Sequence, residues 1–264
     1  TALHARLLEP ERFAEQAVDA DLADGCVYHK HKAAQDEAPD AIILHRGWRD
    51  QIEAIAERVG DHPIAGNLIR QPDIGREATL VWTETVEVRG FGTVEVPCKA
   101  RLDMLHPSMP DLKFTNEGNE HPYQWQRHFY SMGYHQSLAW YLRGMLKLGI
   151  IDAMPERPSA CVATVIAAVT KPPYLVQVYS IPRAYADIGF HDLWTRALPR
   201  YIEYRITGRK APPEYYGLVH DRDANPITKT ADDLLPCHIP HWANPDGEVV
   251  TEISNPTEKI GEPR

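Results

Sequence analysis

The chain has 264 residues, of which 43% are hydrophobic, and its formal net charge at pH 7 is −9. This length and apolar share suffice for one domain with a sizeable core. We expect neither a membrane span nor an N-terminal signal peptide, because no apolar run is long enough for either. An acidic chain does not coat nucleic acid by counterion release alone, so a role on nucleic acid requires local clusters of basic residues.

The cysteines are scattered along the chain without the paired spacing of a disulfide framework. They are Cys26, Cys98, Cys161 and Cys237. This distribution favours a reducing compartment, and we expect a cytoplasmic protein.

Taken in chain order, the apolar periodicity predicts an α+β fold. The expected helices span residues 2–18, 49–59, 63–70, 123–148 and 183–207, and the expected strands span residues 78–83, 85–89, 94–105, 111–115, 161–169 and 174–180. Trp125, Phe129, Met132 and Trp140 are expected to face inward from the long fourth helix. In the last helix Pro199 predicts a kink and Gly208 an end.

Residues 94–115 carry the most informative pattern, which predicts a β-hairpin. In residues 94–105 the even positions are apolar, while Arg101 and Asp103 fall on the odd positions. In residues 111–115, Asp111 and Lys113 share one face and Leu112 the other. We therefore expect Asp103, Asp111 and Lys113 to converge on one side of two paired strands.

Two carboxylates and an amine in this arrangement suit a Mg²⁺-dependent phosphodiesterase. Mg²⁺ prefers oxygen ligands and is usually held by one or two carboxylates, with water and substrate phosphate at the other positions. A neighbouring cation such as Lys113 can orient the attacking water or stabilise charge on phosphorus. Taken alone, the spacing of Asp103, Asp111 and Lys113 favours an ordinary solvent-facing hairpin with surface charges.

Several further segments distinguish these alternatives. They are Thr1 to Phe13, Glu77 to Trp82, Cys98 to Asp103, Asp111 to Lys113, Gly133 to Tyr141, and Val165 to Tyr179 with its Lys171-Pro172-Pro173-Tyr174 turn. In this order they resemble the exonuclease VIII (RecE) group of PD-(D/E)xK nucleases of phage and prophage recombination. The resemblance covers residues 2–217. It implies a restriction-endonuclease-like α/β/α core, with a central mixed sheet flanked by helices.

The resemblance also implies roles for individual residues. Asp103 and Asp111 match the metal carboxylates, and the backbone carbonyl of Leu112 is an additional candidate ligand. Lys113 matches the catalytic lysine. His4 matches a histidine that lies beside the metal on an N-terminal helix, and Glu77 matches an acidic position near the site that could ligate a second ion or a water. Without the resemblance, His4 would be a boundary histidine and Glu77 a surface charge.

The chain departs from the group's pattern at several positions. The group usually shows Gln-x-x-x-Tyr on the helix after the lysine strand, whereas Gln136 and Tyr141 are five residues apart and Ser137 occupies the glutamine position. Phe114 stands where a small hydroxyl residue is usual, and Thr170 where an acidic residue is frequent. We retain Gln136, Tyr141 and Arg101 as candidate substrate-binding residues. Other basic candidates are His29 to Lys32, Lys99, Arg205 and Arg209-Lys210.

The implied activity is a Mg²⁺-dependent exodeoxyribonuclease, with Mn²⁺ as an alternative ion. It would degrade linear double-stranded DNA from its ends in the 5′ to 3′ direction and leave 3′ single strands for an annealing protein. Related enzymes form homo-oligomeric rings. The alternatives are a related endonuclease or single-strand nuclease with the same metal site, and a catalytically inactive DNA-binding or assembly subunit.

The expected organisation is a nuclease domain over residues 1–218 and a polar extension over residues 219–264. Because the resemblance begins in mid-motif, we expect an N-terminal portion to precede Thr1. In the extension, Cys237, His238 and His241 are a weak zinc signal without a fourth ligand. We expect the extension instead to pack through its apolar residues against the domain or a neighbouring subunit.

Overall fold

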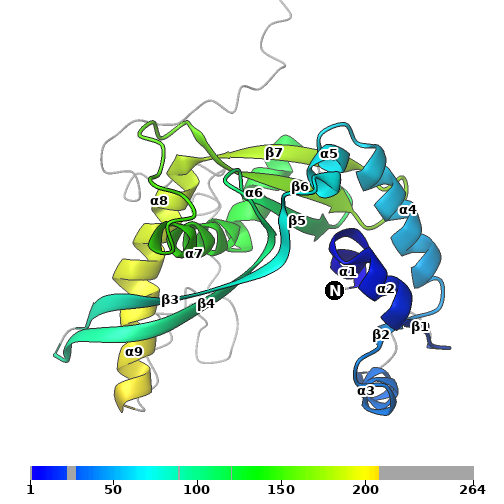
Figure 1. Ribbon diagram of the computed structural model, residues 1–264, viewed down its shortest axis with the longest axis horizontal. Helices are drawn as coiled ribbons and strands as arrows, with labels where there is room; N and C mark the ends of the chain where they lie inside the picture. Colours follow the sequence, from blue (N-terminus) through cyan, green and yellow to red (C-terminus); the bar gives the residue numbers. More distant parts are fainter. Residues whose placement is uncertain (1, 23–27, 89, 120, 208–264) are drawn as a thin grey trace, which may run out of the picture. The chain divides into compact units, whose positions relative to one another are not determined.

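A computed structural model describes residues 2–22, 28–88, 90–119 and 121–207, and its fold is α+β as predicted (Figure 1). The helices are α1 (Ala2–Leu8), α2 (Pro10–Gln16), α3 (Tyr28–Glu37), α4 (Trp48–Asp61), α5 (Ala65–Arg70), α6 (Pro122–Ser131), α7 (Tyr134–Lys147), α8 (Arg183–His191), the π-helical η1 (Asp192–Ala197) and α9 (Leu198–Thr207). The strands are β1 (Ala17–Asp19), β2 (Ile42–Leu44), β3 (Gly75–Val88), β4 (Gly92–Leu105), β5 (Pro110–Thr115), β6 (Cys161–Val169) and β7 (Val176–Pro182).

The chain folds into two compact units that alternate along the sequence. The first unit comprises Thr1–Leu80, Arg101–Trp125 and Cys161–Ile181. The second comprises Val81–Ala100, Gln126–Ala160 and, within the described part of the chain, Pro182–Thr207. The β3–β4 hairpin therefore contributes its base to the first unit and its tip to the second. The expected boundary at residue 218 lies outside the described residues.

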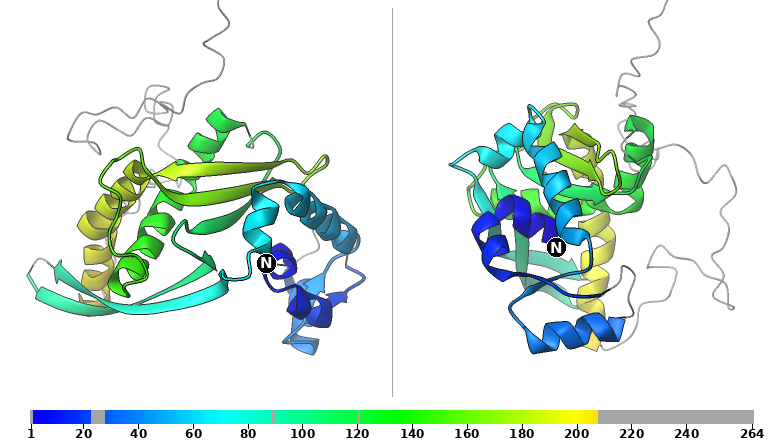
Figure 2. Two further views of the ribbon diagram at one scale, coloured as in Figure 1. Left: turned by 45° about the horizontal axis from the view of Figure 1, so that its top comes forward. Right: turned by 90° about the vertical axis from the view of Figure 1, so that its right-hand side faces the viewer.

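The sheet of the first unit has the order β5-β6-β7 (Figure 2). Strands β5 and β6 are parallel, in a register that pairs Pro110 with Thr164 and Thr115 with Val169. Strands β6 and β7 are neighbours joined by a short turn, and such a connection requires an antiparallel pair. The sheet is therefore mixed, as expected. A separate parallel pair, β1 with β2, lies in the same unit.

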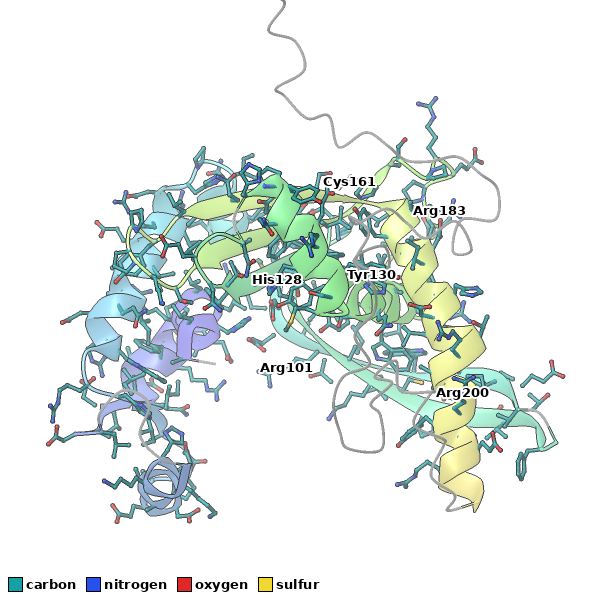
Figure 3. All side chains as sticks on the ribbon, turned by 180° about the vertical axis from the view of Figure 1, so that it is seen from behind. Arg101, His128, Tyr130, Cys161, Arg183 and Arg200 are labelled. Carbon is teal, nitrogen blue, oxygen red and sulfur yellow. The ribbon has the colours of Figure 1, made fainter. Side chains whose placement is uncertain are left out.

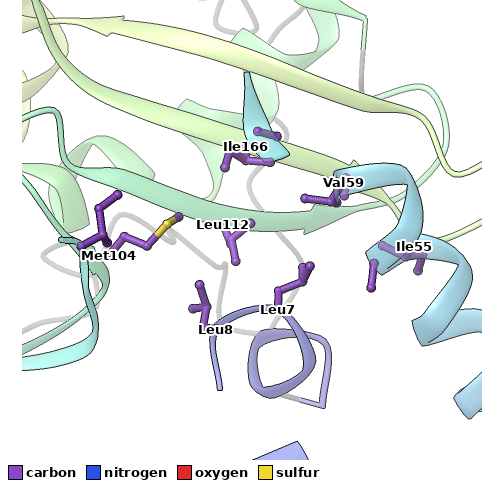
Figure 4. Close-up of a cluster of buried hydrophobic side chains, with 11 residues drawn as sticks. Leu7, Leu8, Ile55, Val59, Met104, Leu112 and Ile166 are labelled. Carbon is purple, nitrogen blue, oxygen red and sulfur yellow. The ribbon is translucent and has the colours of Figure 1, made fainter. Parts of the chain in front are cut away.

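The main core of the first unit joins helices to this sheet. Leu7 and Leu8 of α1, Ile55 and Val59 of α4, and Leu112 of β5 are buried in one cluster (Figure 4). The apolar stripe of α4 follows the 3.6-residue periodicity, and its four members, Ile52, Ile55, Ala56 and Val59, are all buried. The core thereby anchors α1 over β5, the strand that carries Asp111 and Lys113.

The second unit packs α7 closely against α8. A Cβ atom added to Gly189 of α8 would lie 2.1 Å from the backbone oxygen of His135 in α7, so no larger residue fits there without a shift. Apolar residues of the hairpin tip form a further cluster with the last helix. The cluster consists of Val86, Val88, Leu198 and Ile202, flanked by Val94, Val96, Trp140 and Trp194.

Two helices that the sequence predicts as continuous, over residues 2–18 and 123–148, are each interrupted in the structure. The helix predicted over residues 2–18 ends at Leu8 and restarts at Pro10. A proline disfavours helical geometry in the residue before it, and Glu9 is non-helical, with φ −132° and ψ 60°. The helix predicted over residues 123–148 is interrupted at Gly133, whose φ is +68°. Met132, expected to face inward, is 56% exposed because it lies at this break.

The predicted pairing of residues 94–105 with residues 111–115 is wrong. Strand β4 pairs with β3, and β5 belongs to the β5-β6-β7 sheet. The two expected strands at 78–83 and 85–89 are one continuous strand, which supplies β4 with a partner of equal length. The sequence pattern specified the faces of β4 correctly but carried no information about which neighbour occupies its edge.

The predicted helix over residues 183–207 is helical throughout, with a π-helical segment at Asp192–Ala197 just before Pro199. Proline removes one backbone hydrogen bond and its ring clashes with the preceding turn, which accounts for widened geometry at the expected kink. The predicted end at Gly208 and the Cys237-His238-x-x-His241 segment lie outside the described residues. Among the described helices, none is both long and apolar enough to cross a membrane.

Candidate active site

Asp103 lies near the end of β4, where the alternating pattern directs odd residues outward and buries Leu102 and Met104. Its side chain is only 16% exposed. The Leu112 N–H donates a hydrogen bond of 2.8 Å to Asp103 Oδ2. This hydrogen bond fixes the Asp103 side chain of β4 against the backbone of β5, although the two strands do not pair in a sheet.

Asp111 and Lys113 lie two residues apart on β5, and the Lys113 Nζ forms an ion pair with Asp111 Oδ2. Both side chains are largely buried, with exposed fractions of 12% for Asp111 and 18% for Lys113. The Lys113 Nζ also lies 3.4 Å from the Leu112 carbonyl oxygen, to which it donates. The predicted convergence of Asp103, Asp111 and Lys113 therefore occurs, although the strands are not paired as predicted.

His4 reaches this cluster from α1. Its Nε2 atom lies 3.5 Å from Asp103 Oδ2, and its ring meets the ring of Phe114 edge-on, with centroids 5.0 Å apart. Phe114 is the residue that departs from the expected small hydroxyl side chain. Here it supports the imidazole on the side of β5.

The two carboxyl groups have opposite pKa shifts. Burial raises the pKa of Asp111 to about 6, the Lys113 ammonium opposes this, and the neighbouring Asp103 charge adds to it. Burial would also raise the pKa of Asp103, but His4, the Lys113 charge and the Leu112 N–H outweigh it and lower that pKa. Two carboxylates that share a site behave in this way when one retains its charge and the other is driven toward its protonated form.

Glu77, the other acidic residue expected near the metal, is bound by Arg101. Its Oε2 accepts a hydrogen bond of 2.5 Å from Arg101 Nε. Its backbone φ is +50°, in the left-handed region that non-glycine residues rarely adopt. Such a conformation costs on the order of 1–3 kcal/mol and persists only where surrounding contacts hold it. The expected role of Glu77 as a ligand of an ion or a water competes with this guanidinium contact.

The donor set fits Mg²⁺. Asp103 and Asp111 supply carboxylate oxygens, and Leu112 supplies a backbone carbonyl oxygen, which are the ligands that this hard cation prefers. No group of three or more His, Cys, Asp or Glu side chains within the described ranges has the arrangement of a metal cage. Mg²⁺ does not require one, since it is commonly held by one or two carboxylates and retains several waters.

Of the other candidates for substrate binding, Gln136 and Tyr141 lie in the second unit, and Arg209 and Lys210 lie outside the described residues. Gln136 Nε2 donates to Asp192 Oδ2 at 3.4 Å, and Tyr141 is half-buried on the same helix, α7. The sequence reasoning missed Glu9, whose Oε2 lies 3.9 Å from Arg101 Nη2. Its only sequence signal was its place beside Pro10 in the segment that resembles the nuclease motif.

No family model and no curated protein matches the chain. Among solved structures, it is similar to the crystal structure of a protein from Eubacterium rectale named "putative exonuclease". The two are 13% identical, with a TM-score of 0.48, and the match covers 78% of this chain and 72% of the other.

Proposed function

We propose that this protein is a Mg²⁺-dependent exodeoxyribonuclease that degrades linear double-stranded DNA in the 5′ to 3′ direction and leaves 3′ single strands. One observation carries the proposal. His4, Asp103, Asp111 and Lys113 come from α1, β4 and β5, and they meet in one largely buried cluster. Their meeting supports a nuclease because two carboxylates can hold Mg²⁺ and a neighbouring amine can stabilise charge on a scissile phosphate, as the resemblance to the RecE group implies.

The chain's own residues have distinct parts in this chemistry. Asp103, Asp111, the Leu112 carbonyl and His4 would hold the ion, which when bound polarises the phosphoryl oxygen and acidifies a water. Asp103 is kept ionised by its neighbours and retains its charge for binding. Lys113 reaches the same cluster with a positive charge that can orient the attacking water and stabilise charge that develops on phosphorus. Burial of the cluster strengthens each of these interactions.

Substrate and partners follow from the same resemblance. The proposed substrate is the end of a DNA duplex, and the proposed partner is a single-strand annealing protein that receives the 3′ strand. Several copies of the chain would form a ring around the duplex. Mn²⁺ would replace Mg²⁺ because it accepts the same oxygen ligands.

The test is digestion of a linear 5′-labelled duplex by the wild-type chain and by Lys113→Ala, each with Mg²⁺ or Ca²⁺. We expect mononucleotides only with Mg²⁺, because Ca²⁺ binds with looser geometry. We expect Lys113→Ala to be at least 10²-fold slower, as is typical when a charge-stabilising group is lost. Unchanged digestion by this variant would refute the role of Lys113.

A closed circular duplex separates the leading proposal from its alternatives. An exonuclease leaves the circle intact, whereas an endonuclease nicks or linearises it, and a single-strand nuclease digests only a single-stranded substrate. Absence of digestion on every substrate, with retained DNA binding, would favour an inactive DNA-binding or assembly subunit.

A further inference from the structure

Arg101 links two carboxylates from separate elements of the first unit. Its Nε donates to Glu77 Oε2 of β3 at 2.5 Å, and its Nη2 lies 3.9 Å from Glu9 Oε2, between α1 and α2. Glu77 and Glu9 are 15% and 28% exposed, whereas Arg101 is 53% exposed and extends from β4 (Figure 3). Arg101 is therefore fixed from two sides by better-buried acidic groups.

Both carboxylates are themselves held in place. The left-handed backbone of Glu77 within β3 sets the direction in which its side chain leaves the strand. Glu9 Oε2 accepts a hydrogen bond of 2.7 Å from Arg12 Nη1. The Glu9 backbone N–H donates to the Ala5 carbonyl at 2.9 Å. These two contacts hold Glu9 at the end of α1, so its carboxylate is a fixed partner for Arg101.

The position of this contact relates it to the candidate active site. Arg101 precedes Asp103 by two residues on the same outward face of β4. Glu9 follows His4 by five residues at the end of α1. The bridge from Glu77 through Arg101 to Glu9 therefore joins the strand that carries Asp103 to the helix that carries His4, whose side chains lie 3.5 Å apart.

We propose that Glu77, Arg101 and Glu9 form a clamp that positions His4 against Asp103 for binding of the divalent ion. The proposal rests on the metal site of the proposed function. It assigns Glu77 a positioning role in place of the ligand role expected from the resemblance, and it gives Arg101 a role in the absence of DNA. Groups that orient metal ligands change metal affinity by about 10–100-fold when they are removed.

Arg101→Gln distinguishes the clamp from simple electrostatics. Loss of a positive charge near a cation site should strengthen metal binding if charge alone mattered. The clamp predicts the opposite, because the end of α1 loses its ionic link to β4. We expect titration calorimetry with Mn²⁺ alone to show about tenfold weaker binding by Arg101→Gln than by the wild-type chain, and a loss of similar size for Glu77→Gln.

A double-mutant cycle tests whether the effect passes through His4. In a His4→Gln background, Glu77→Gln should cause no further loss of Mn²⁺ affinity, because the group that it positions is gone. The matched control is Glu53→Gln, which breaks the Arg6–Glu53 pair of 2.7 Å that ties the same helix α1 to α4. We expect it to change Mn²⁺ affinity by less than twofold.

Each other outcome overturns a defined part of the account. Unchanged or tighter Mn²⁺ binding by Arg101→Gln would overturn the clamp. So would an equal loss from Glu77→Gln with and without His4, which would make Glu77 a direct ligand. A loss for Glu53→Gln as large as that for Glu77→Gln would reduce the effect to general stability of α1. Absence of Mn²⁺ binding by the wild-type chain would overturn the proposed function and the clamp together.

Should Glu77→Gln fail to fold, as judged by circular dichroism, Glu9→Gln tests the same bridge from its other end. This variant leaves the backbone of β3 unchanged. The clamp again predicts weaker Mn²⁺ binding that disappears in the His4→Gln background, and unchanged affinity would contradict it.

Discussion

At the scale of single residues, the site combines a carboxyl group of lowered pKa with one of raised pKa. Because burial raises the pKa of Asp111 to about 6, this group binds a proton below that pH. A divalent ion must displace the proton. We therefore expect Mn²⁺ affinity to rise by about tenfold per pH unit below pH 6 and to level off above it, as measured by calorimetry between pH 5 and 7.5.

Asp111→Asn provides the control for this pH dependence. The variant cannot titrate at this position, so its residual Mn²⁺ affinity should vary less with pH than that of the wild-type chain. A wild-type affinity that is flat from pH 5 to 7 would contradict the assignment of Asp111 as a ligand.

The residue scale also shows how far the sequence could predict this site. Alternation along β4 correctly placed Asp103 outward and Leu102 inward, because a strand has a period of two whichever neighbour it pairs with. The contact of His4 with Asp103 depended on the family resemblance, since no local pattern relates residues 99 positions apart. The bond between Glu77 and Arg101 could not be predicted, because it depends on the rare left-handed backbone of Glu77.

At the scale of elements, Glu84 stabilises the hairpin tip against α7 within the second unit. It is fully buried and accepts hydrogen bonds from Trp82 Nε1 at 2.9 Å and from Arg143 Nε at 2.7 Å. Burial alone would raise the pKa of Glu84, but Arg143, Trp82 and Lys147 outweigh it and lower the pKa below the ordinary value of 4.5. The contribution of ionised Glu84 to the free energy of unfolding is therefore complete above pH 4.5. It is lost as the pH falls through the lower pKa that Glu84 has in the folded state.

We expect Glu84→Gln to lower the free energy of unfolding by about 2–3 kcal/mol at pH 7, since hydrogen bonds to a charged group are lost. The difference from the wild-type chain should shrink as the pH falls below 4.5. Urea unfolding at pH 7 and at pH 3.5 measures both effects. Glu87→Gln, at an exposed position of the same strand, is the control and should have little effect. A difference that does not change with pH would contradict the role of the Glu84 charge.

Gly144 of α7 packs closely against Trp82 of the same hairpin. A Cβ atom added there would lie 2.9 Å from Trp82 Cζ3 and 3.1 Å from its Cε3. Although alanine is the better helix former, Gly144→Ala should destabilise the protein by about 1–3 kcal/mol through overpacking. Gly60→Ala in α4 is the matched control, because its nearest neighbour is a flexible Arg70 atom at 3.9 Å. It should be neutral or stabilising. Equal effects of the two variants in thermal unfolding would refute this interpretation.

The errors in the predicted elements have local physical causes. Proline and glycine interrupted two predicted helices, at Pro10 and Gly133, where the apolar periodicity continued across the break. Periodicity measures which side of an element is apolar and is insensitive to one residue with a different backbone conformation. By contrast, β6 contains neither proline nor glycine, and the one glycine of α4, Gly60, lies in its last turn, so both predictions were close to the observed bounds.

At the scale of the whole molecule, the sequence predicted the α+β class and the mixed sheet but not which strands pair. Strand pairing depends on contacts between distant segments, such as β5 with β6, which are separated by two helices. The proposed hydrolysis rests on the chemistry of one small cluster in the first unit, and the proposed duplex substrate rests on the resemblance to the RecE group.

The central claim is that Asp103 and Asp111 together bind a divalent ion. Its most direct test is the anomalous scattering of Mn²⁺ in crystals of the full chain. We predict a strong peak within bonding distance of both carboxylates, with the Lys113 amine displaced from Asp111 and retained beside the ion. A peak at another site, or an Asp111–Lys113 ion pair that persists at saturating Mn²⁺, would contradict the account.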